Sequence, residues 1–475
     1  MFLISRGELE GRFDPIYYCN ELFGFLKTTQ YAVKKISDVA VSLKSGFGAG
    51  KQDQEQEGNG IVQIRPTNVG NEGNLKFDKN VYLPLDLLET QQNNLLQKGD
   101  VLFNNTNSQE LVGKTALFNE DGNFLFSNHI TRIRTKNDVL PQFLVLLLNS
   151  LHSKKLFYSI CTNWNNQSGV GIELLRSLKI PVPPLEIQAK IISIFETAYN
   201  SKKQKETEAA QLLASIDGYL LEALGITLPP TSEKKTFFIT NSSKISGGRF
   251  DPKKYVPENE QLIKSLGNGK YESLPLKDFL LQSVSGDWGI EDAKEGFKKA
   301  LVIRATEFDN LFNLKLDNSR VKYRFINEIK LEKMDLQVND LLIEKSGGSE
   351  NQPVGRIAII TQELADNHSL AFSNFIHKIR VDTARLHSDY LFSFLKTIHN
   401  IKITDLMQSQ TNGIRNLIMR EYLNIQIPLP PLEKQTEIAD HISALRSQAK
   451  QLQHEAQTEL ERAKSEVERM ILGDE

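Results

Sequence analysis

The pattern of hydrophobic and polar positions divides the chain into two kinds of segment, and each kind occurs twice. Short runs of β-branched and aromatic residues, separated by Gly, Asn and Ser, predict strands, as in GIVQIRPTNV (60–69) and FLFSNHITRIR (124–134). An apolar helical stretch follows at Pro141–Ile160, and its partner is Ser388–Asn400. These blocks predict α+β domains, each built on a strongly curved β-sheet with helices.

A long stretch with apolar residues three and four positions apart follows each block. It opens with IPVPPLEIQAKI at Ile180–Ile191 and with IPLPPLEKQTEI at Ile427–Ile438. Proline is tolerated at a helix start, because the first N–H groups have no partner inside the helix. Each stretch therefore predicts a helix of about 38 residues, roughly 57 Å long, that ends near Gly225 or Gly473.

The apolar positions of the two long helices keep the same spacing and predict a coiled-coil seam. We expect the two helices to pack against each other in antiparallel fashion around a pseudo-twofold axis. Lys202 and Lys205 interrupt the first seam; either their stems lie along it with the ammonium groups in water, or they bind a partner. The predicted helix-pair and partner interface comprises Ile191, Phe195, Lys202, Lys205, Leu213, Ile216, Ile438, Ile442, Leu445, Leu452, Leu460 and Val467.

Four phrases recur in the same order, which indicates an internal duplication. Besides the proline-rich phrase, GRFDP stands at Gly11–Pro15 and Gly248–Pro252, and FSNHITRIR at Phe126–Arg134 matches FSNFIHKIR at Phe372–Arg380. VGKTALF and VGRIAII form the remaining pair. The predicted domains are a first mixed domain at 1–182, a helix at 183–225, a second mixed domain at 226–429 and a helix at 430–475.

Composition favours a soluble cytoplasmic protein. The net charge is −2, so no strong overall field draws the chain to nucleic acid or to a membrane, although a basic face balanced by acidic helices stays compatible with DNA binding. Two cysteines, Cys19 and Cys161, are typical of a reducing compartment. Nothing approaches the roughly 20 apolar residues of a membrane span, and we expect no membrane contact.

A search for catalytic motifs predicts none. VGKT at Val112–Thr115 lacks the first glycine of a phosphate-binding loop, and the second copy reads VGRI. The histidines are scattered without metal-ligand spacing, and the Asn/Asp-Pro-Pro-aromatic motif of amino-methyltransferases is missing. We expect no catalytic residue and no metal ligand in this chain.

Polar loops at matching positions in both halves remain as candidates. They combine Gly with Asn, Gln, Ser, Lys and Arg, which hydrogen-bond base edges and phosphates; the alternative for each is an ordinary surface loop. Lys114 and Arg356 follow Val-Gly in both copies and are hypothesised to contact phosphate or base. Trp288 either stacks on a base or anchors its loop, and Arg65 and Arg304 suit structural pairing as well as phosphate contact. The candidate DNA-binding residues are Lys51, Asn104, Lys114, Gln167, Ser168, Trp288, Lys345, Arg356, Gln410, Asn412 and Arg415.

The doubled phrase IPxPPLExQxxI, with GRFDP opening both halves, resembles the specificity subunit of type I restriction-modification systems. The resemblance implies two target-recognition domains that each grip one half of a bipartite, asymmetric double-stranded DNA target. It implies a helix pair that sets the gap and docks two modification subunits. S-adenosylmethionine, ATP and Mg²⁺ are then expected in the modification and restriction (translocase) partners, not in this chain. Two alternatives stay open: a non-catalytic two-domain scaffold for proteins or carbohydrate, and a single-chain methyltransferase.

Overall fold

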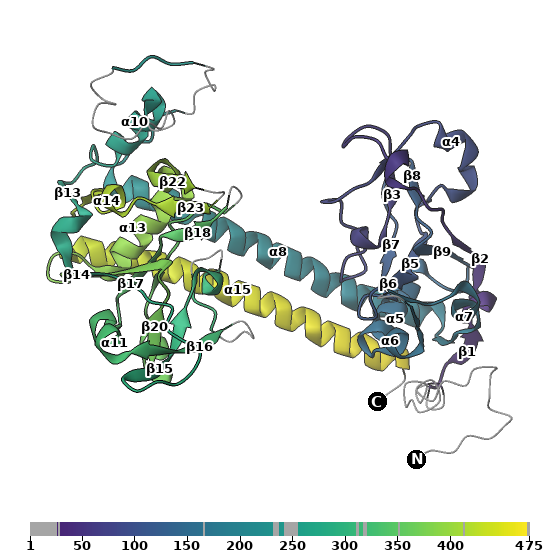
Figure 1. The fold of residues 1–475 in the computed structure, drawn as a ribbon. Helices are drawn as coiled ribbons and strands as arrows, with labels where there is room; N and C mark the ends of the chain where they lie inside the picture. The colour runs from purple at the N-terminus through teal and green to yellow at the C-terminus, as the bar shows by residue number, and fades with distance from the viewer. Residues whose placement is uncertain are drawn as a thin grey trace. The chain divides into compact units, whose positions relative to one another are not determined.

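The computed structural model describes residues 26, 29–164, 167–230, 237–241, 255–309, 313–316, 321–349, 352–411 and 414–472 (Figure 1). Both GRFDP phrases lie outside these residues. Contacts divide the chain into two compact units: unit 1 comprises 1–206 and 453–475, and unit 2 comprises 207–452. Each unit therefore joins one mixed domain to parts of both long helices, and this division cuts across the linear one drawn from the sequence.

Unit 1 distributes its strands among several small sheets. The largest is antiparallel, in the order β2 (Ala40–Ser45), β9 (Ile130–Thr135), β5 (Val101–Asn104), β7 (Thr115–Leu117). A second has the order β4 (Tyr82–Leu83), β3 (Ile61–Ile64), β8 (Phe124–Phe126), with β3 and β8 parallel. The remaining pairings are β1 (Ala32–Lys35) with β12 (Lys179–Val182), and the small sheet β10 (Thr162–Trp164), β11 (Gln167–Gly169), β6 (Thr106–Asn107).

Unit 2 repeats this arrangement sheet by sheet. Its largest sheet has the order β14 (Leu280–Ser285), β21 (Ile376–Val381), β17 (Leu341–Glu344), β19 (Ile357–Ile359). The second has the order β16 (Lys322–Asn327), β15 (Phe297–Ile303), β20 (Leu370–Phe372), again with one parallel pair. The others are β13 (Ser273–Pro275) with β24 (Gln426–Pro428), and β18 (Ser346–Gly348), β23 (Ile414–Leu417), β22 (Gln408–Thr411). The duplication predicted from short phrases thus extends to strand order and direction.

Helices cover these sheets and complete the cores. Unit 1 contains α3 (Ile36–Val39), α4 (Leu87–Thr90), α5 (Pro141–Ser153), α6 (Leu156–Ile160) and α7 (Ile172–Ser177), with 3-10 turns η3 (Lys51–Asp53), η4 (Pro66–Asn68) and η5 (Gln92–Asn94). Unit 2 contains α10 (Pro257–Ser265), α11 (Glu328–Met334), α12 (Gln362–Asn367), α13 (Ser388–Asn400) and α14 (Met419–Tyr422), with η7 (Leu276–Phe279), η8 (Ala305–Glu307) and η9 (Ile403–Met407). The apolar stretch expected at 141–160 is two helices, because Lys155 takes the left-handed conformation between them (φ 61°).

The glutamine of the proline-rich phrase fixes each long helix to its domain. Gln188, fully buried, donates to the carbonyls of Pro183 (2.8 Å) and Asp138 (3.0 Å) and accepts from the N–H of Leu140 (2.8 Å). Gln435 makes the equivalent three bonds in unit 2, to Pro430, Arg385 and His387. A buried amide that makes three hydrogen bonds is stabilising, and leaving its partners unpaired is costly. The glutamine of the phrase therefore connects the start of the long helix to the loop before α5 or α13.

The long helices are α8 (Leu185–Leu224) and α15 (Leu432–Leu472), shown in teal and yellow in Figure 1. In unit 1, Ile191 near the start of α8 shares a core with Val467 and Ile471 near the end of α15. In unit 2, Leu220 at the end of α8 shares a core with Ile438 at the start of α15. Within each unit the two helices are therefore antiparallel. The predicted seam positions Ile191, Ile216, Ile438, Ile442, Leu460 and Val467 are buried, and Phe195, Leu213, Leu445 and Leu452 are partly buried.

The two lysines that interrupt the seam form ion pairs inside unit 1. Lys205 Nζ lies 2.5 Å from Glu459 Oε1 and 3.2 Å from Glu455 Oε2, both on α15, and Ser201 Oγ donates to Glu459. The hydrogen bond to Glu459 raises the pKa of Lys205. Lys202 pairs with Glu206 on its own helix at 2.9 Å and approaches Glu72 at 3.7 Å. A polar pair at a seam position selects one register and one direction of pairing.

Candidate nucleic-acid interface

The polar segments around the candidates Asn104 and Gln167 meet in the small three-stranded sheet of unit 1, and those around Lys345 and Arg415 meet in that of unit 2. In unit 1, β6 follows directly on β5, and β11 pairs with β6 and with β10. In unit 2, β18 follows β17, and β23 pairs with β18 and with β22. Segments that are distant in sequence are therefore brought together at equivalent places in both units.

Asn105 joins three segments of unit 1, namely the end of β2, the turn before β9 and the residue after β11. Its side-chain amide donates to Thr131 Oγ1 (2.9 Å), to the carbonyl of Asn128 (3.2 Å) and to Ser45 Oγ (3.5 Å). Its backbone N–H donates to His129, and its carbonyl accepts from Val170 beyond β11. Ser45 and Thr131 also hydrogen-bond to each other, at 3.2 Å. We call Ser45, Asn105 and Thr131 the junction of unit 1.

Lys345 occupies the same place in unit 2. Its backbone N–H donates to Phe375, the equivalent of His129, and its carbonyl accepts from Leu417 at the end of β23. Lys345 Nζ donates to Ser285 Oγ at 2.9 Å, and His377 lies within hydrogen-bond distance of Ser283 (2.7 Å) and of Ser285 (3.3 Å). Ser285, Lys345 and His377 are thus the junction of unit 2.

The two junctions share geometry and differ in charge. Unit 1 uses an amide and two hydroxyl groups, whereas unit 2 uses an ammonium, an imidazole and a hydroxyl. Burial lowers the pKa of His377 to about 4, with a further contribution from the charge of Lys345, and burial also lowers the pKa of Lys345. At neutral pH His377 is therefore neutral, and unit 2 places the Lys345 amine where unit 1 has the neutral, buried side chain of Asn105.

A glycine brings the first loop close to each junction. A Cβ on Gly46 would lie 2.0 Å from the carbonyl oxygen of Phe126, and a Cβ on Gly286 would lie 2.1 Å from that of Phe372. Only glycine allows this approach, so the loops after β2 and β14 are held beside the turns that follow β8 and β20. The loops at Gly46 and Gly286 are therefore closely packed parts of the candidate interface.

Several predicted DNA-binding residues lie around these sheets. Trp288, 36% exposed, packs edge-on against Phe375 beside Lys345. Gln167 is exposed on β11, and its neighbour Ser168 is buried and donates to Asn163. Arg415 lies on the central strand β23, opposite Gln410. The side chain of Gln410 and all of Asn412 lie outside the described residues, and Lys51 is exposed on η3, a separate element.

Arg356 lies in a setting that does not suit contact with DNA. It is 6% exposed and forms a two-pronged salt bridge with Glu344, both contacts at 2.8 Å. Its guanidinium also donates to the carbonyls of Phe308 and Ala305. The hypothesis that Arg356 contacts phosphate or base therefore gives way to a structural role, because each of its three guanidinium nitrogens is hydrogen-bonded inside unit 2.

Two further candidates have hydrogen-bond partners outside the small sheet of unit 1. Asn104 is 1% exposed, and its amide donates to the carbonyl of Leu111, so it closes the β5–β7 turn. Lys114 donates to Asn71 at 2.6 Å and lines a hollow of about 270 Å³ together with Phe195 and Val467 of the long helices. Arg65 and Arg304 are both in local structural pairs: Arg65 donates to Gln63 and Ala49, and Arg304 to Glu307.

Sequence reasoning missed the residues that organise the interface. Asn105, Thr131, Phe375 and His377 were not singled out, although Thr131, Phe375 and His377 lie in the recurring phrases FSNHITRIR and FSNFIHKIR. Matching FSNHIT with FSNFIH would have placed Thr131 opposite His377 and His129 opposite Phe375. The contacts of Asn105 and Thr131 with Ser45, and of His377 with Ser285, are long-range and had no signal in the sequence.

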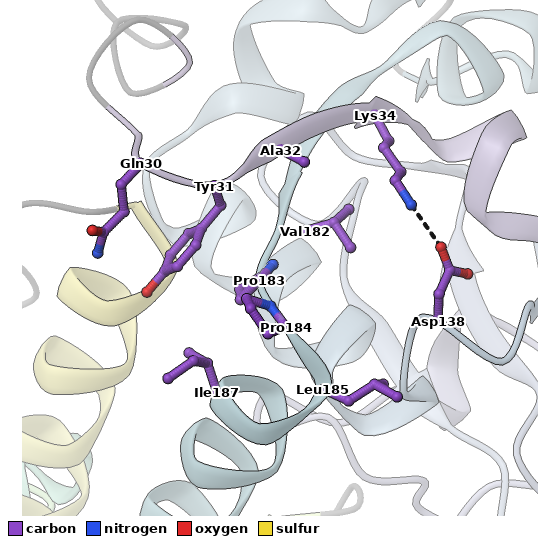
Figure 2. Close-up of a pocket in the computed structure, with 10 residues that line it drawn as sticks. All are labelled: Gln30, Tyr31, Ala32, Lys34, Asp138, Val182, Pro183, Pro184, Leu185 and Ile187. Carbon is purple, nitrogen blue, oxygen red and sulfur yellow. Dashed lines mark hydrogen bonds and ion pairs between the residues drawn. The ribbon is translucent and has the colours of Figure 1, made fainter.

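A larger hollow of unit 1 lies at the start of α8. It has a volume of about 630 Å³ and is bordered by Tyr31, Pro183, Pro184 and Ile187. Figure 2 shows the Lys34 ammonium reaching the Asp138 carboxylate at its edge, and this ion pair spans 2.7 Å. The pair lowers the pKa of Asp138. The hollow is built from the proline-rich phrase and is separate from the junction.

Acidic side chains near the sheets serve as structural partners. Asp100 pairs with Arg134 at 2.6 Å, and Asp340 pairs with Arg380 at 2.7 Å in the equivalent place. Over the part of the chain that the structure describes, no group of three or more His, Cys, Asp and Glu side chains is placed to hold a metal ion. Within the same residues, no helix is both long and apolar enough to cross a membrane.

Comparison with known proteins identifies a family. The type I restriction modification DNA specificity domain matches residues 29–214 and 269–462. The putative type I restriction enzyme MjaX specificity subunit of Methanocaldococcus jannaschii is 25% identical over 448 residues, 93% of this chain and 92% of that protein. The EcoKI specificity subunit of Escherichia coli K12 is 24% identical over 183 residues, 38% of each chain. A solved structure concerned with complex assembly and conformational transition of the type I R-M system is 16% identical, with a TM-score of 0.52 over 94% of this chain and 98% of that one.

Proposed function

The chain belongs to the family of type I restriction-modification DNA specificity domains, and from this membership we propose that it is the DNA-recognition subunit of such a complex. Each unit reads one half of a bipartite target in double-stranded DNA. Long helices α8 and α15 set the unread gap between the half-sites. The relatives from M. jannaschii and E. coli are both named specificity subunits, and the match covers 92% and 38% of their lengths.

The observation that carries the proposal is the pair of equivalent junctions. Two small sheets rich in Asn, Gln, Ser and Thr recur at matching places, and each is held by a junction residue, Asn105 or Lys345. Side chains of these types hydrogen-bond base edges and phosphates, and an interface fixed by internal bonds loses little entropy on binding. A duplicated chain with one polar reader per repeat matches a target made of two half-sites.

The chemistry of the two junctions favours an asymmetric target. Asn105 and Thr131 of unit 1 are buried and hydrogen-bonded within the chain, whereas Lys345 of unit 2 is half-buried and adds a donor beside its small sheet. A lysine prefers guanine O6 and N7 or a phosphate, and unit 1 has the buried Asn105 at the equivalent place. The half-sites read by the two units therefore differ in sequence.

The remaining parts of the proposal concern partners. We propose that two modification subunits dock on the helix pair and that restriction (translocase) subunits complete the complex in the cytoplasm. Those partners supply S-adenosylmethionine, ATP and Mg²⁺, and this chain contributes sequence recognition without catalysis. The long helices support this assignment, since they offer two similar polar outer faces along α8 and α15.

The test uses the complete modification complex. The chain is expressed in a host with its modification partner, and methylated bases are mapped along the genome. The expected result is one bipartite, asymmetric motif with a fixed gap, bound in vitro as duplex DNA with an affinity that falls as salt rises. Absence of any motif, together with salt-independent or no binding to duplex DNA, would reject recognition and favour a scaffold. Binding of S-adenosylmethionine by the isolated chain would instead favour a single-chain methyltransferase.

A further inference from the structure

An exposed aromatic pair borders the junction of unit 2. Trp288 and Phe375 are each 36% exposed, and their rings meet edge to face with centroids 6.0 Å apart. The carbonyl of Phe375 accepts hydrogen bonds from the N–H groups of Lys345 and Ser346, at 2.9 and 3.3 Å. The pair therefore lies directly beside β18, at the edge of the small polar sheet.

The loop that carries Trp288 is fixed on both sides of the indole. Asp287 donates its N–H to the carbonyl of Phe372 at 2.9 Å, accepts from the N–H of Gly289 at 2.8 Å and forms an ion pair with Lys330. Gly289 has φ +64°, and a Cβ there would lie 2.5 Å from the carbonyl oxygen of Phe325. A tight turn that only glycine can make thus fixes the backbone on both sides of Trp288, which lowers the entropy that this loop loses on binding.

Unit 1 lacks this pair at the equivalent positions. Gly46 and Gly286 correspond through their contacts with Phe126 and Phe372, which places Gly48 opposite Trp288. His129 stands opposite Phe375, since each accepts from the junction residue, Asn105 or Lys345. The aromatic pair is therefore an addition to the shared scaffold of unit 2 and is not required for the fold.

A positive charge lies next to the aromatic pair. Lys345 Nζ is held by Ser285 Oγ at 2.9 Å and is half-buried, so it keeps capacity to donate to an incoming group. Proteins that insert apolar side chains between base pairs combine such wedges with basic residues on the flanking backbone. Aromatic rings stack on the face of any base, and a lysine ammonium contacts a phosphate or the edge of a purine.

We infer that Trp288 and Phe375 form an aromatic wedge that enters the base stack of the half-site read by unit 2, with Lys345 contacting the DNA beside it. Unit 1 reads its own half-site without a wedge. The inference rests on the proposed function and adds a mode of recognition to it. Unstacking one base step bends the duplex locally, so the half-site of unit 2 is recognised partly by how easily that step deforms.

The test uses the complete modification complex and duplexes of its mapped target. 2-Aminopurine replaces bases one at a time in both half-sites, avoiding the methylated bases, which a modification subunit itself extrudes. In the wild-type complex we expect a fluorescence change at one base step, in one half-site only. Trp288→Ala and Phe375→Ala remove that change and weaken binding by about 5- to 100-fold, and Trp288→Phe retains part of both.

Matched variants separate the wedge from general effects. His129→Ala, at the place of Phe375 in unit 1, leaves the fluorescence change in position, and Ile329→Ala, which truncates an exposed residue on α11, leaves affinity unchanged. We expect the thermal unfolding midpoint of each variant to match that of the wild type. A wild-type complex that binds its target specifically without any such change, or a Trp288→Ala complex that binds as tightly as wild type, overturns the wedge and leaves the proposed function standing. A wild-type complex without sequence-specific binding overturns both.

Discussion

At the scale of single residues, Arg356 and Lys114 follow the same Val-Gly pair in different surroundings. Arg356 is buried against Glu344, whereas Lys114 is half-buried against Asn71. Burial raises the pKa of Glu344 and Arg356 opposes that shift, so the carboxylate depends on the guanidinium to stay ionised. The same position of the repeat is thus half-buried in unit 1 and part of the buried core in unit 2.

Arg356→Ala should destabilise unit 2 by about 3–5 kcal/mol, because it leaves a buried carboxylate without its partner. The matched variant Lys114→Ala should cost unit 1 about 1 kcal/mol or less, since only one hydrogen bond is lost. Hydrogen exchange measures both effects, as the amide protection of β17 and β19 in the Arg356 variant and of β5 and β7 in the Lys114 variant. Equal protection in the two variants would contradict the structural role of Arg356.

His399 should make unit 2 sensitive to acid. Burial, with a smaller effect of the Arg356 charge, lowers its pKa from 6.5 to about 4. Between these values the unfolded chain binds the proton and the folded chain does not, so stability falls as pH drops from about 6.5 to about 4, by up to about 3 kcal/mol. His399→Gln should flatten this part of the pH profile of urea unfolding. His454→Gln, on an exposed position of α15, should leave it unchanged; an unaltered slope for His399→Gln would contradict the prediction.

At the scale of secondary-structure elements, each long helix contributes one end to each core. Ile191 of α8 is buried in unit 1 with Val467 of α15, and Ile438 of α15 is buried in unit 2 with Leu220 of α8. The seam is therefore shared between two compact units and does not form a separate coiled-coil domain.

Ile191→Ala should destabilise unit 1 by about 2–4 kcal/mol and spare unit 2, and Ile438→Ala should do the reverse. Both side chains are fully buried, so each truncation leaves a cavity of similar size. Hydrogen exchange resolved by peptide measures the two units separately in one sample. Loss of protection in both units for either variant would show that the helices couple the units into one cooperative body.

The elements were predictable to different degrees. Hydrophobic spacing of three and four placed α8 and α15 within two residues of their observed starts at Leu185 and Leu432, because a long helix buries one continuous stripe. The helix α13 was predicted at its observed bounds, Ser388–Asn400. The division of each curved sheet into small sheets was not predicted, since strand pairing is a long-range choice that local pattern does not fix.

The candidate interface shows the same limit. Gly-rich polar loops were visible in the sequence, and Trp288 and Lys345 were selected from them. Asn105 and His377 were not, because their importance lies in hydrogen bonds to residues distant in sequence, such as Thr131, 26 positions from Asn105, and Ser285, 92 positions from His377. Arg356 shows the converse error: a basic side chain in a polar loop suggested DNA contact, and its buried partner Glu344 was not apparent from spacing alone.

At the scale of the whole molecule, the duplication offers a direct test of how the target gap is set. Insertion of seven residues into α8 after Glu206 and into α15 after Leu452 adds two turns to each helix, about 10.5 Å. Seven residues preserve the three-and-four spacing of the seam, so the helices can pair as before. At about 3.4 Å per base pair, the gap of the methylated motif should lengthen by about three base pairs while both half-sites keep their sequence.

Genome-wide mapping of methylated bases measures the length of this gap. Insertion into α8 alone is the control, and it should abolish methylation because the seams of the two helices no longer match. An unchanged gap in the double insertion would show that the helices do not set it.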